Sequence, residues 1–215
     1  VIAIIVVLAS IFLPLAFNKL QRADEASSDA SIQEIAAALT AFYDDVRHFP
    51  TCNGADCSPV VGTVNDLRFL AFGTGDGDIS GEYPSAVAAW NFATNGETTA
   101  EKNNGFNHLV QNDPNGSGAT DGSDYDTAGG RRWRGPYLSR VGADPWGRAF
   151  IVHVGAMETG GCPVGSTGVP PACTAPATGT RGWILSAGPD NSLDTSPSAN
   201  SLGTTDDRGF IFNTQ

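Results

Sequence analysis

The sequence predicts an α+β fold in which one long amino-terminal helix packs on a small antiparallel β-sheet. Three observations support this prediction: an uncharged apolar run at residues 1–17, an amphipathic stretch at 24–46, and three short apolar segments in the carboxyl-terminal third. They divide the chain into an apolar half-helix (1–18), an amphipathic half-helix (19–50), a surface insertion with a short helix (51–104) and a globular β-sheet region (105–215).

The first 17 residues carry no charge, and this length is at the short end of what spans a bilayer as a helix. A secretory signal peptide would have a basic start and a small-residue cleavage site. Here neither is found, and the run continues into Asn18, Lys19 and Leu20 without a break. We therefore expect a retained segment that lies in a membrane or against copies of itself.

The second half of the predicted helix is amphipathic. Its apolar residues recur at spacings of three and four, which places them on one helical face: Ile32, Ile35, Leu39, Phe42 and Val46. Pro50 favours an end to the helix near residues 47–49, because the residue before a proline avoids the helical region. Pro14 removes one helical hydrogen bond, so we expect a kink there.

Three short segments rich in β-branched and aromatic residues predict strands at 149–154, 181–185 and 208–212. Loops rich in Gly, Pro and Asp separate them, which favours a three-stranded antiparallel sheet. A sheet this small needs a helix across one face, and the amphipathic half-helix supplies it. Between the helix and these strands, residues 85–94 predict a short helix. Trp146 in the turn Asp-Pro-Trp-Gly is expected to be a packing anchor.

The chain of 215 residues has a net charge of −11, which argues against a nucleic-acid partner, because phosphate binding needs patches of Lys and Arg. No nucleophile elbow, phosphate-binding loop, dinucleotide fingerprint or zinc-protease motif is present in the sequence. We therefore expect a protein that is not an enzyme. His153 lies on a predicted strand and is interpreted as a packed or surface residue.

The four cysteines form two close pairs in loops rich in Gly and Pro, Cys52 with Cys57 and Cys162 with Cys173. A zinc site would need short spacings together with converging histidines, and the three histidines are scattered. Two local disulfides are the better interpretation, and they imply an oxidising compartment. The alternative is four unpaired thiols, although free cysteines are more often buried than placed in polar loops.

One loop of the insertion begins like an EF-hand calcium loop, with Asp76, Asp78, Ser80 and Gly81 at the first, third, fifth and sixth positions. The twelfth position, where a bidentate Glu is required, is Val87. We interpret this stretch as a Gly/Asp turn.

The chain resembles the type IV pilin superfamily, most closely the major pseudopilin of type II secretion systems. The resemblance rests on VIAIIVVLASIFLP with its Pro14, on Trp133-Arg134-Gly135-Pro136-Tyr137-Leu138 followed by Asp144-Pro145-Trp146-Gly147, on a weaker match at 105–110, and on Ser186-Ala187-Gly188-Pro189-Asp190. It covers residues 1–50 and about 105–215, with gaps. Members of this family have a processed, methylated amino terminus with an early Glu, which is not visible in this sequence.

The resemblance implies a structural subunit that polymerises through its amino-terminal helix, with Ile5, Leu8, Phe12 and Pro14 in the assembly segment. Subunits would be stored in the inner membrane, face the periplasm, and form a homopolymer with the help of an assembly machinery. A secretion pseudopilus is the first interpretation. A long extracellular fibre, or a minor or tip subunit acting as an adhesin, is the alternative.

The resemblance also implies a structural calcium ion near the carboxyl terminus, where oxygen ligands are concentrated. Its ligands would be the carbonyl of Ala187 and the side chains of Asp190, Ser192, Asp206 and Asp207, with Asp194 as a further possibility. The residues 193–205 lengthen this loop relative to the family, which leaves the choice between Ser192 and Asp194 open.

Overall fold

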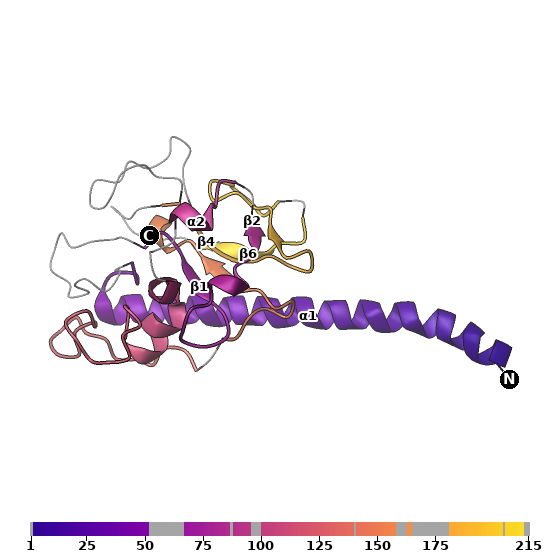
Figure 1. Ribbon diagram of the computed structural model, residues 1–215, viewed down its shortest axis with the longest axis horizontal. Coiled ribbons are helices and arrows are strands. Elements are labelled where there is room, and N and C mark those ends of the chain that lie inside the picture. Colours follow the sequence, from indigo (N-terminus) through magenta and orange to yellow (C-terminus); the bar gives the residue numbers. More distant parts are fainter. Residues whose placement is uncertain are drawn as a thin grey trace.

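The structure is a computed structural model that describes residues 2–51, 67–86, 88–95, 100–139, 141–157, 163–164, 181–203 and 205–212, with the backbone alone at 2–9, 11, 94–95 and 100. Figure 1 shows a long helix that runs beneath a globular part and continues well beyond it toward the amino terminus.

Helix α1 spans Ile2–Val46 and includes Pro14. At about 1.5 Å per residue it is roughly 70 Å long. The helix is continuous through Pro14, and Figure 1 shows that its amino-terminal part curves away from the axis of the rest. The predicted stripe from Ile32 to Val46 is confirmed, because each of its five side chains is at most 2% exposed.

The main sheet has four strands among the described residues, in the order β1-β3-β4-β6, and all its pairs are antiparallel. The bounds are Leu70–Phe72 for β1, Phe150–Val152 for β3, Gly182–Ser186 for β4 and Arg208–Phe212 for β6. The three predicted strands are confirmed as β3, β4 and β6. The prediction of a three-stranded sheet is wrong, because β1 adds a fourth strand at the edge next to β3.

Both faces of this sheet are covered. Toward α1, the side chains of Phe150, Val152 and Ile184 pack with the helical stripe in one core cluster. Alternate residues point the other way, so Ile151 and Trp183 belong to a second cluster. This alternation is the two-residue period of a strand. Buried strands of this kind read as continuous apolar runs rather than as a polar-apolar pattern.

The second core uses residues that we expected to form a surface insertion. Ile79 and Trp90 are at most 2% exposed and pack with Trp183. The indole Nε1 of Trp90 donates a hydrogen bond to the carbonyl of Thr195 at 2.7 Å. The expectation of a surface insertion is therefore wrong for this part of 51–104, because the outer face of the sheet needs an apolar cover.

Shorter elements complete the described parts. A small parallel pair joins β2 (Ser85–Ala86) to β5 (Ser192–Leu193). The helix expected at 85–94 is reduced to α2 (Phe92–Asn95), and the weak helix expected at 105–110 is a π-helix, η3 (Asn107–Gln111). Short 3-10 turns occur at Ser80–Glu82 (η1), Ala100–Asn103 (η2) and Val154–Ala156 (η4).

Two expectations concern residues that are not described. All four cysteines, Cys52, Cys57, Cys162 and Cys173, lie outside the described residues. The side chains of Ile5 and Leu8 also lie outside them. Within the portion that is described, α1 included, no helix combines the length and the apolar character needed to cross a membrane.

Candidate functional site

The candidate metal site lies in the loop that follows β4. Gly188 has a φ of 69° and Asn191 a φ of 60°, and the amide of Asn191 donates to the carbonyl of Gly188 at 3.2 Å, which closes a tight turn. A Cβ at Gly188 would lie 2.4 Å from the carbonyl oxygen of Asp206. Glycine therefore allows two chain segments, 188–194 and 206–207, to approach each other closely.

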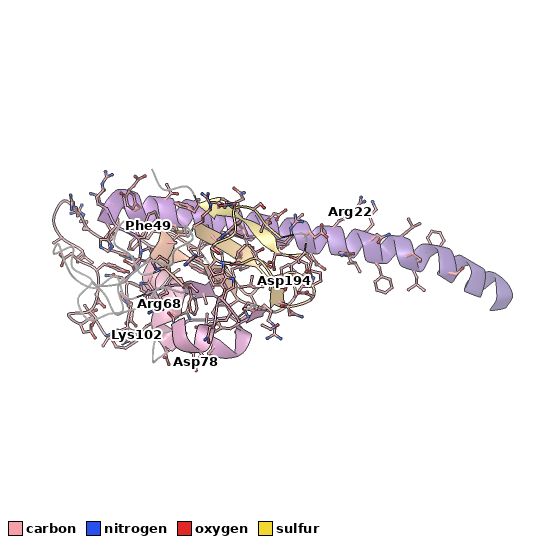
Figure 2. The ribbon with its side chains drawn as sticks, turned by 90° about the horizontal axis from the view of Figure 1, so that it is seen from above. Arg22, Phe49, Arg68, Asp78, Lys102 and Asp194 are labelled. Carbon is pink, nitrogen blue, oxygen red and sulfur yellow. The ribbon has the colours of Figure 1, made fainter. Side chains whose placement is uncertain are left out.

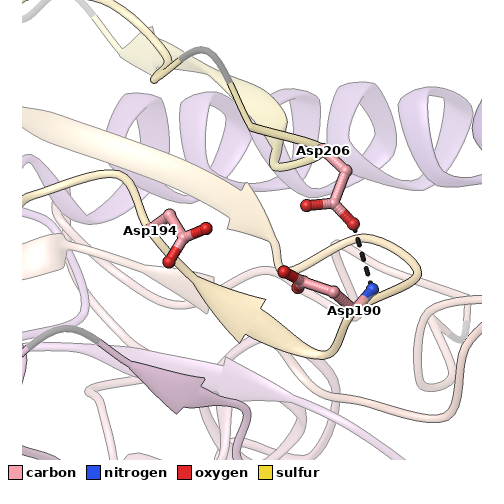
Figure 3. A group of neighbouring side chains, drawn as sticks. All are labelled: Asp190, Asp194 and Asp206. Carbon is pink, nitrogen blue, oxygen red and sulfur yellow. Dashed lines mark hydrogen bonds between the residues drawn. The ribbon is translucent and has the colours of Figure 1, made fainter.

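Three carboxylates meet in this loop. One oxygen from each of Asp190, Asp194 and Asp206 lies within 4.8 Å of the others. Figure 3 shows the three side chains directed toward one another from separate parts of the loop. The amide of Asp190 donates to Oδ2 of Asp206 at 3.0 Å, which orients that carboxylate (Figure 3). Carboxylate oxygens on a bent loop are the ligands that calcium prefers.

Of the five expected ligands, the structure brings Asp190 and Asp206 together. The third carboxylate of this group belongs to Asp194, the residue that was expected as an alternative to Ser192. The Oδ2 of Asp207 instead accepts the amides of Asp194 at 3.0 Å and of Thr195 at 2.6 Å. Burial raises the pKa of the Asp207 carboxyl. Its Oδ1 is buried and has no hydrogen-bond partner. Asp207 therefore stabilises the backbone at residues 194 and 195 through these two hydrogen bonds.

The remaining two expected ligands have other surroundings. Ser192 lies in β5, and its amide donates to Oδ1 of Asp190 at 2.7 Å. Ala187 is fully buried in the second core. Only the carbonyl oxygen of Ala187 was expected to be a ligand. Ala187 directly precedes the Gly188 turn, so it adjoins the segments 188–194 and 206–207, which we call the acidic loop.

The Asp-Pro-Trp-Gly turn is joined to the same loop through a buried acid. Asp144 is 4% exposed, and its Oδ1 accepts the amides of Trp146 at 3.1 Å and Arg148 at 2.8 Å. Its Oδ2 accepts the hydroxyl of Ser186 at 2.7 Å, and that hydroxyl accepts the amide of Gly188 at 3.3 Å. Trp146 is half-buried, and the fully buried group of this turn is its aspartate.

The segment 133–138 is attached to the carboxyl-terminal end of α1. Asp45 binds the guanidinium of Arg134 at 3.1 Å and the hydroxyl of Tyr137 at 3.2 Å. The ring of Tyr137 packs edge-on against Phe42, with centroids 5.5 Å apart. These contacts fix the globular part to the helix at one end.

A second attachment lies closer to the point where α1 leaves the globular part. The guanidinium of Arg208, at the start of β6, binds both carboxylate oxygens of Asp29 and lies 3.9 Å from a carboxylate oxygen of Glu25. A bidentate pair of this kind fixes orientation as well as distance. The carboxyl-terminal strand is therefore joined directly to the helix.

Beyond this attachment the helix carries exposed apolar side chains. They are 52–63% exposed: Phe12, Leu13, Leu15, Phe17 and Leu20. Figure 2 shows the helix around the labelled Arg22 standing clear of the globular part, with side chains pointing outward. A soluble helix would normally present one apolar stripe to a core. Here the apolar residues fall at 12, 13, 15, 17 and 20, and nothing in the described chain covers them.

The two fully buried histidines have structural surroundings. His108 bonds the hydroxyl of Tyr125 through Nδ1 at 2.7 Å and the carbonyl of Lys102 through Nε2 at 2.9 Å. Nε2 of His153 accepts the amide of Val164 at 2.8 Å. Burial lowers the pKa of both imidazoles to about 4. Neither ring faces solvent, in agreement with the interpretation of His153 as a packed residue.

Comparisons of the chain with models of protein families, with curated proteins and with solved structures give no match.

Proposed function

We propose that this protein is the structural subunit of a filament that assembles through α1, most like the shaft of a type II secretion pseudopilus. The observation that carries the proposal is the apolar part of α1 outside the globular domain, from Phe12 to Leu20, with more than half of each large apolar side chain exposed. Leaving several such side chains in water is unfavourable by roughly 25 cal/mol for each Å². They therefore require a partner.

A second copy of the same helix is the partner that fits best. The segment is apolar on several sides, so one helix can contact more than one neighbour. Head-to-tail stacking of identical subunits is a heterologous contact that does not close and so generates a helical polymer. The globular parts would coat the outside, and their net negative charge keeps that coat soluble.

Before assembly, the same segment would be held in the inner membrane, with the globular part in the periplasm. The uncharged run at 1–17 supports this proposal. Assembly exchanges lipid contacts for contacts between helices, and an assembly machinery would carry out that exchange.

We further propose that the acidic loop binds a structural calcium ion. Asp190, Asp194 and Asp206 would be its side-chain ligands, with the carbonyl of Ala187 completing the set. The short distances among the three carboxylates support this assignment, because their mutual repulsion is relieved by a cation.

The filament proposal is tested by placing a charge in the exposed segment. We expect Leu8→Glu and Phe12→Glu to abolish fibres in cells, because a carboxylate in a helix bundle or a bilayer loses its hydration. Two matched controls are available. Gln21→Glu introduces the same charge at an exposed polar position of α1, and Phe12→Leu keeps the apolar character; both should assemble normally.

The measurement is electron microscopy of material sheared from cells and of envelope fractions, with the subunit identified by mass spectrometry. Circular dichroism of the purified chain in detergent shows whether the globular part remains folded. Normal fibres from Phe12→Glu would overturn the proposal. Long extracellular fibres from the unaltered chain would favour a surface fibre over a short periplasmic shaft.

A further inference from the structure

The charges of α1 are separated along the helix. Its residues up to Asn18 carry none, and its only cations are Lys19 and Arg22, which we call the cation pair. Every charged residue of α1 beyond them is an acid, and the first two are Asp24 and Glu25, which we call the acid pair. An isolated helix would gain more from opposite charges spaced three or four residues apart. The separation therefore points to a contact outside the helix itself.

The cation pair has no acid partner in the part of the chain that the structure describes. Lys19 and Arg22 are exposed, and no salt bridge among the described residues reaches them. Glu25 is the only acid three or four positions from either cation, and it lies 3.9 Å from Arg208 instead. Figure 2 shows Arg22 on the part of α1 that stands clear of the globular part. Both cations are therefore accessible to another molecule.

The cation pair stands at the edge of the exposed apolar segment. Phe17 is 63% exposed and Leu20 is 61% exposed, and both lie within two residues of Lys19. When these apolar side chains are covered, the cations on the same turns of the helix lose part of their hydration. A charge that loses water without gaining a partner is unfavourable. Whatever covers Phe17 and Leu20 must therefore offer negative charge at this level of the helix.

A second copy of α1 offers negative charge there only if it is offset along the helix axis. Two parallel copies without an offset place Lys19 beside Lys19 and Asp24 beside Asp24, and like charges repel each other. If one copy is moved toward the carboxyl-terminal end of its neighbour, its cation pair comes level with the neighbour's acid pair. The positions differ by two to six residues. At 1.5 Å per residue the offset is about 3–9 Å.

An antiparallel pair of helices would not cover the apolar segment. Bringing Lys19 level with Glu25 of an inverted copy would place Phe12 level with Ile32 of that copy. Ile32 is 2% exposed and lies in the globular core. The exposed apolar side chains of one helix would then face the globular part of the other instead of their own counterparts. Only the parallel, offset arrangement satisfies the charges and the apolar segment together.

We propose that the cation pair of one subunit binds the acid pair of a neighbouring subunit and thereby sets the axial offset between copies in the filament. This inference rests on the proposed assembly through α1 and names the polar contact that fixes its register. The side chain of Glu25 is 35% exposed, so a second cation can reach it. An ionised carboxylate has two oxygens and accepts several donors, so Glu25 can keep its contact with Arg208.

The test reverses the charges and measures fibres in cells, by electron microscopy of sheared material and of envelope fractions. Lys19→Glu with Arg22→Glu places acids beside acids, and we expect it to lower the fibre yield at least about tenfold. Asp24→Lys with Glu25→Lys places cations beside cations and should cause a similar loss. The chain with all four substitutions again has opposite charges at the same offset. Its yield should return to within about threefold of that of the unaltered chain.

Gln21→Glu is the matched control, because residue 21 lies on a different side of the helix from Lys19 and Arg22 and leaves both cations in place. Circular dichroism in detergent shows whether each variant is folded. If the chain with Glu25→Lys does not fold, because Glu25 lies near Arg208, Asp24→Lys alone replaces it. No salt bridge among the described residues involves Asp24, and the same restoration is expected with Lys19→Glu and Arg22→Glu.

The possible results separate this inference from the filament proposal. No fibres from the unaltered chain would contradict both. Fibres whose yield neither reversal changes would overturn the inference alone. A loss with the reversed cation pair that the reversed acid pair does not restore would assign Lys19 and Arg22 to another anion, such as the phosphate headgroups of a bilayer, and would also overturn it. An image reconstruction in which no cation pair lies level with a neighbour's acid pair would do the same.

Discussion

At the scale of single residues, Asp144 combines burial with the largest set of local hydrogen bonds in its turn. It connects the turn at 144–147 to Ser186 at the end of β4, and Ser186 connects to Gly188 at the acidic loop. Burial raises the pKa of its carboxyl, while hydrogen bonds from Ser186, Arg148 and Trp146 act in the opposite direction. The residue therefore holds together two segments that are about 40 positions apart in the sequence.

We expect Asp144→Ala to lower the free energy of unfolding by about 2–3 kcal/mol, because it leaves a buried hydroxyl and two amides without an acceptor. Urea unfolding of the full chain in detergent measures this change. Asp78→Ala is the control, since Asp78 is exposed and its hydrogen bonds are local, among them one from the amide of Ser80 at 2.8 Å. A loss no greater for Asp144→Ala than for Asp78→Ala would contradict the structural role.

The buried histidines predict a dependence of stability on pH. Their pKa values are about 4 in the folded chain and about 6.5 when unfolded, so between these values the unfolded chain binds more protons. The stability that neutral His108 and His153 provide is therefore present above pH 6.5 and is lost as the pH falls toward 4. At pH 5.5 the loss is roughly 1 kcal/mol per histidine.

The measurement is the free energy of unfolding in urea at pH 7.5 and at pH 5.5. Burial raises the pKa of the Asp144 carboxyl, so this residue contributes to the pH dependence with the opposite sign. Replacing His153 with Gln should remove about half of the difference between the two pH values. Equal stability at both pH values in the unaltered chain would show that the imidazoles do not stay neutral.

At the scale of elements, the sequence predicted those with strong periodicity or strong β-propensity. The stripe from Ile32 to Val46 identified the packed half of α1, and the apolar runs around Phe150, Trp183 and Phe210 identified three strands. These patterns are local, so they can be recognised without knowing what the segment contacts.

The strand β1 could not be predicted in the same way. It has only three residues, Leu70–Phe72, and its evidence as a strand is the pairing with β3, about 80 residues later. Nothing in a single short apolar segment distinguishes a sheet edge from the inside of a loop. The same limit applies to Trp90, whose burial depends on the outer face of the sheet.

The candidate site was predicted in part. Asp190 and Asp206 meet as expected, whereas Asp207 binds backbone amides, because the residues between β5 and β6 turn its side chain toward Asp194 and Thr195.

The acidic carboxyl-terminal loop yields a prediction at this scale. Removing calcium with a chelator should lower the melting temperature of the full chain in detergent, because an ion that binds only the folded state stabilises it. Asp206→Asn should remove a part of this shift, and Asp24→Asn on α1, outside the acidic loop, should leave the shift unchanged. The readout is the difference in melting temperature with calcium and with chelator.

An identical shift in Asp206→Asn and in the unaltered chain would contradict an ion at this loop.

At the scale of the whole molecule, the chain has two regions with different surroundings. The second half of α1 is part of a core that also contains the sheet, whereas the first half extends beyond every other described segment (Figure 1). The sequence predicted this division, because the stripe at 32–46 has a period and the run at 1–17 has none. The sequence did not predict how the globular part is fixed along the helix.

That attachment has a mechanical consequence. Arg208 joins the first residue of β6 to Asp29 and Glu25 near the place where α1 leaves the globular part, and β6 pairs with β4 over five residues. A pull on the free end of α1 would therefore be passed in part through this guanidinium to the edge strand β6 and from it to β4, and several backbone hydrogen bonds would share the load. In the proposed filament, this attachment would let the chain carry tension without relying on the apolar contacts of its core alone.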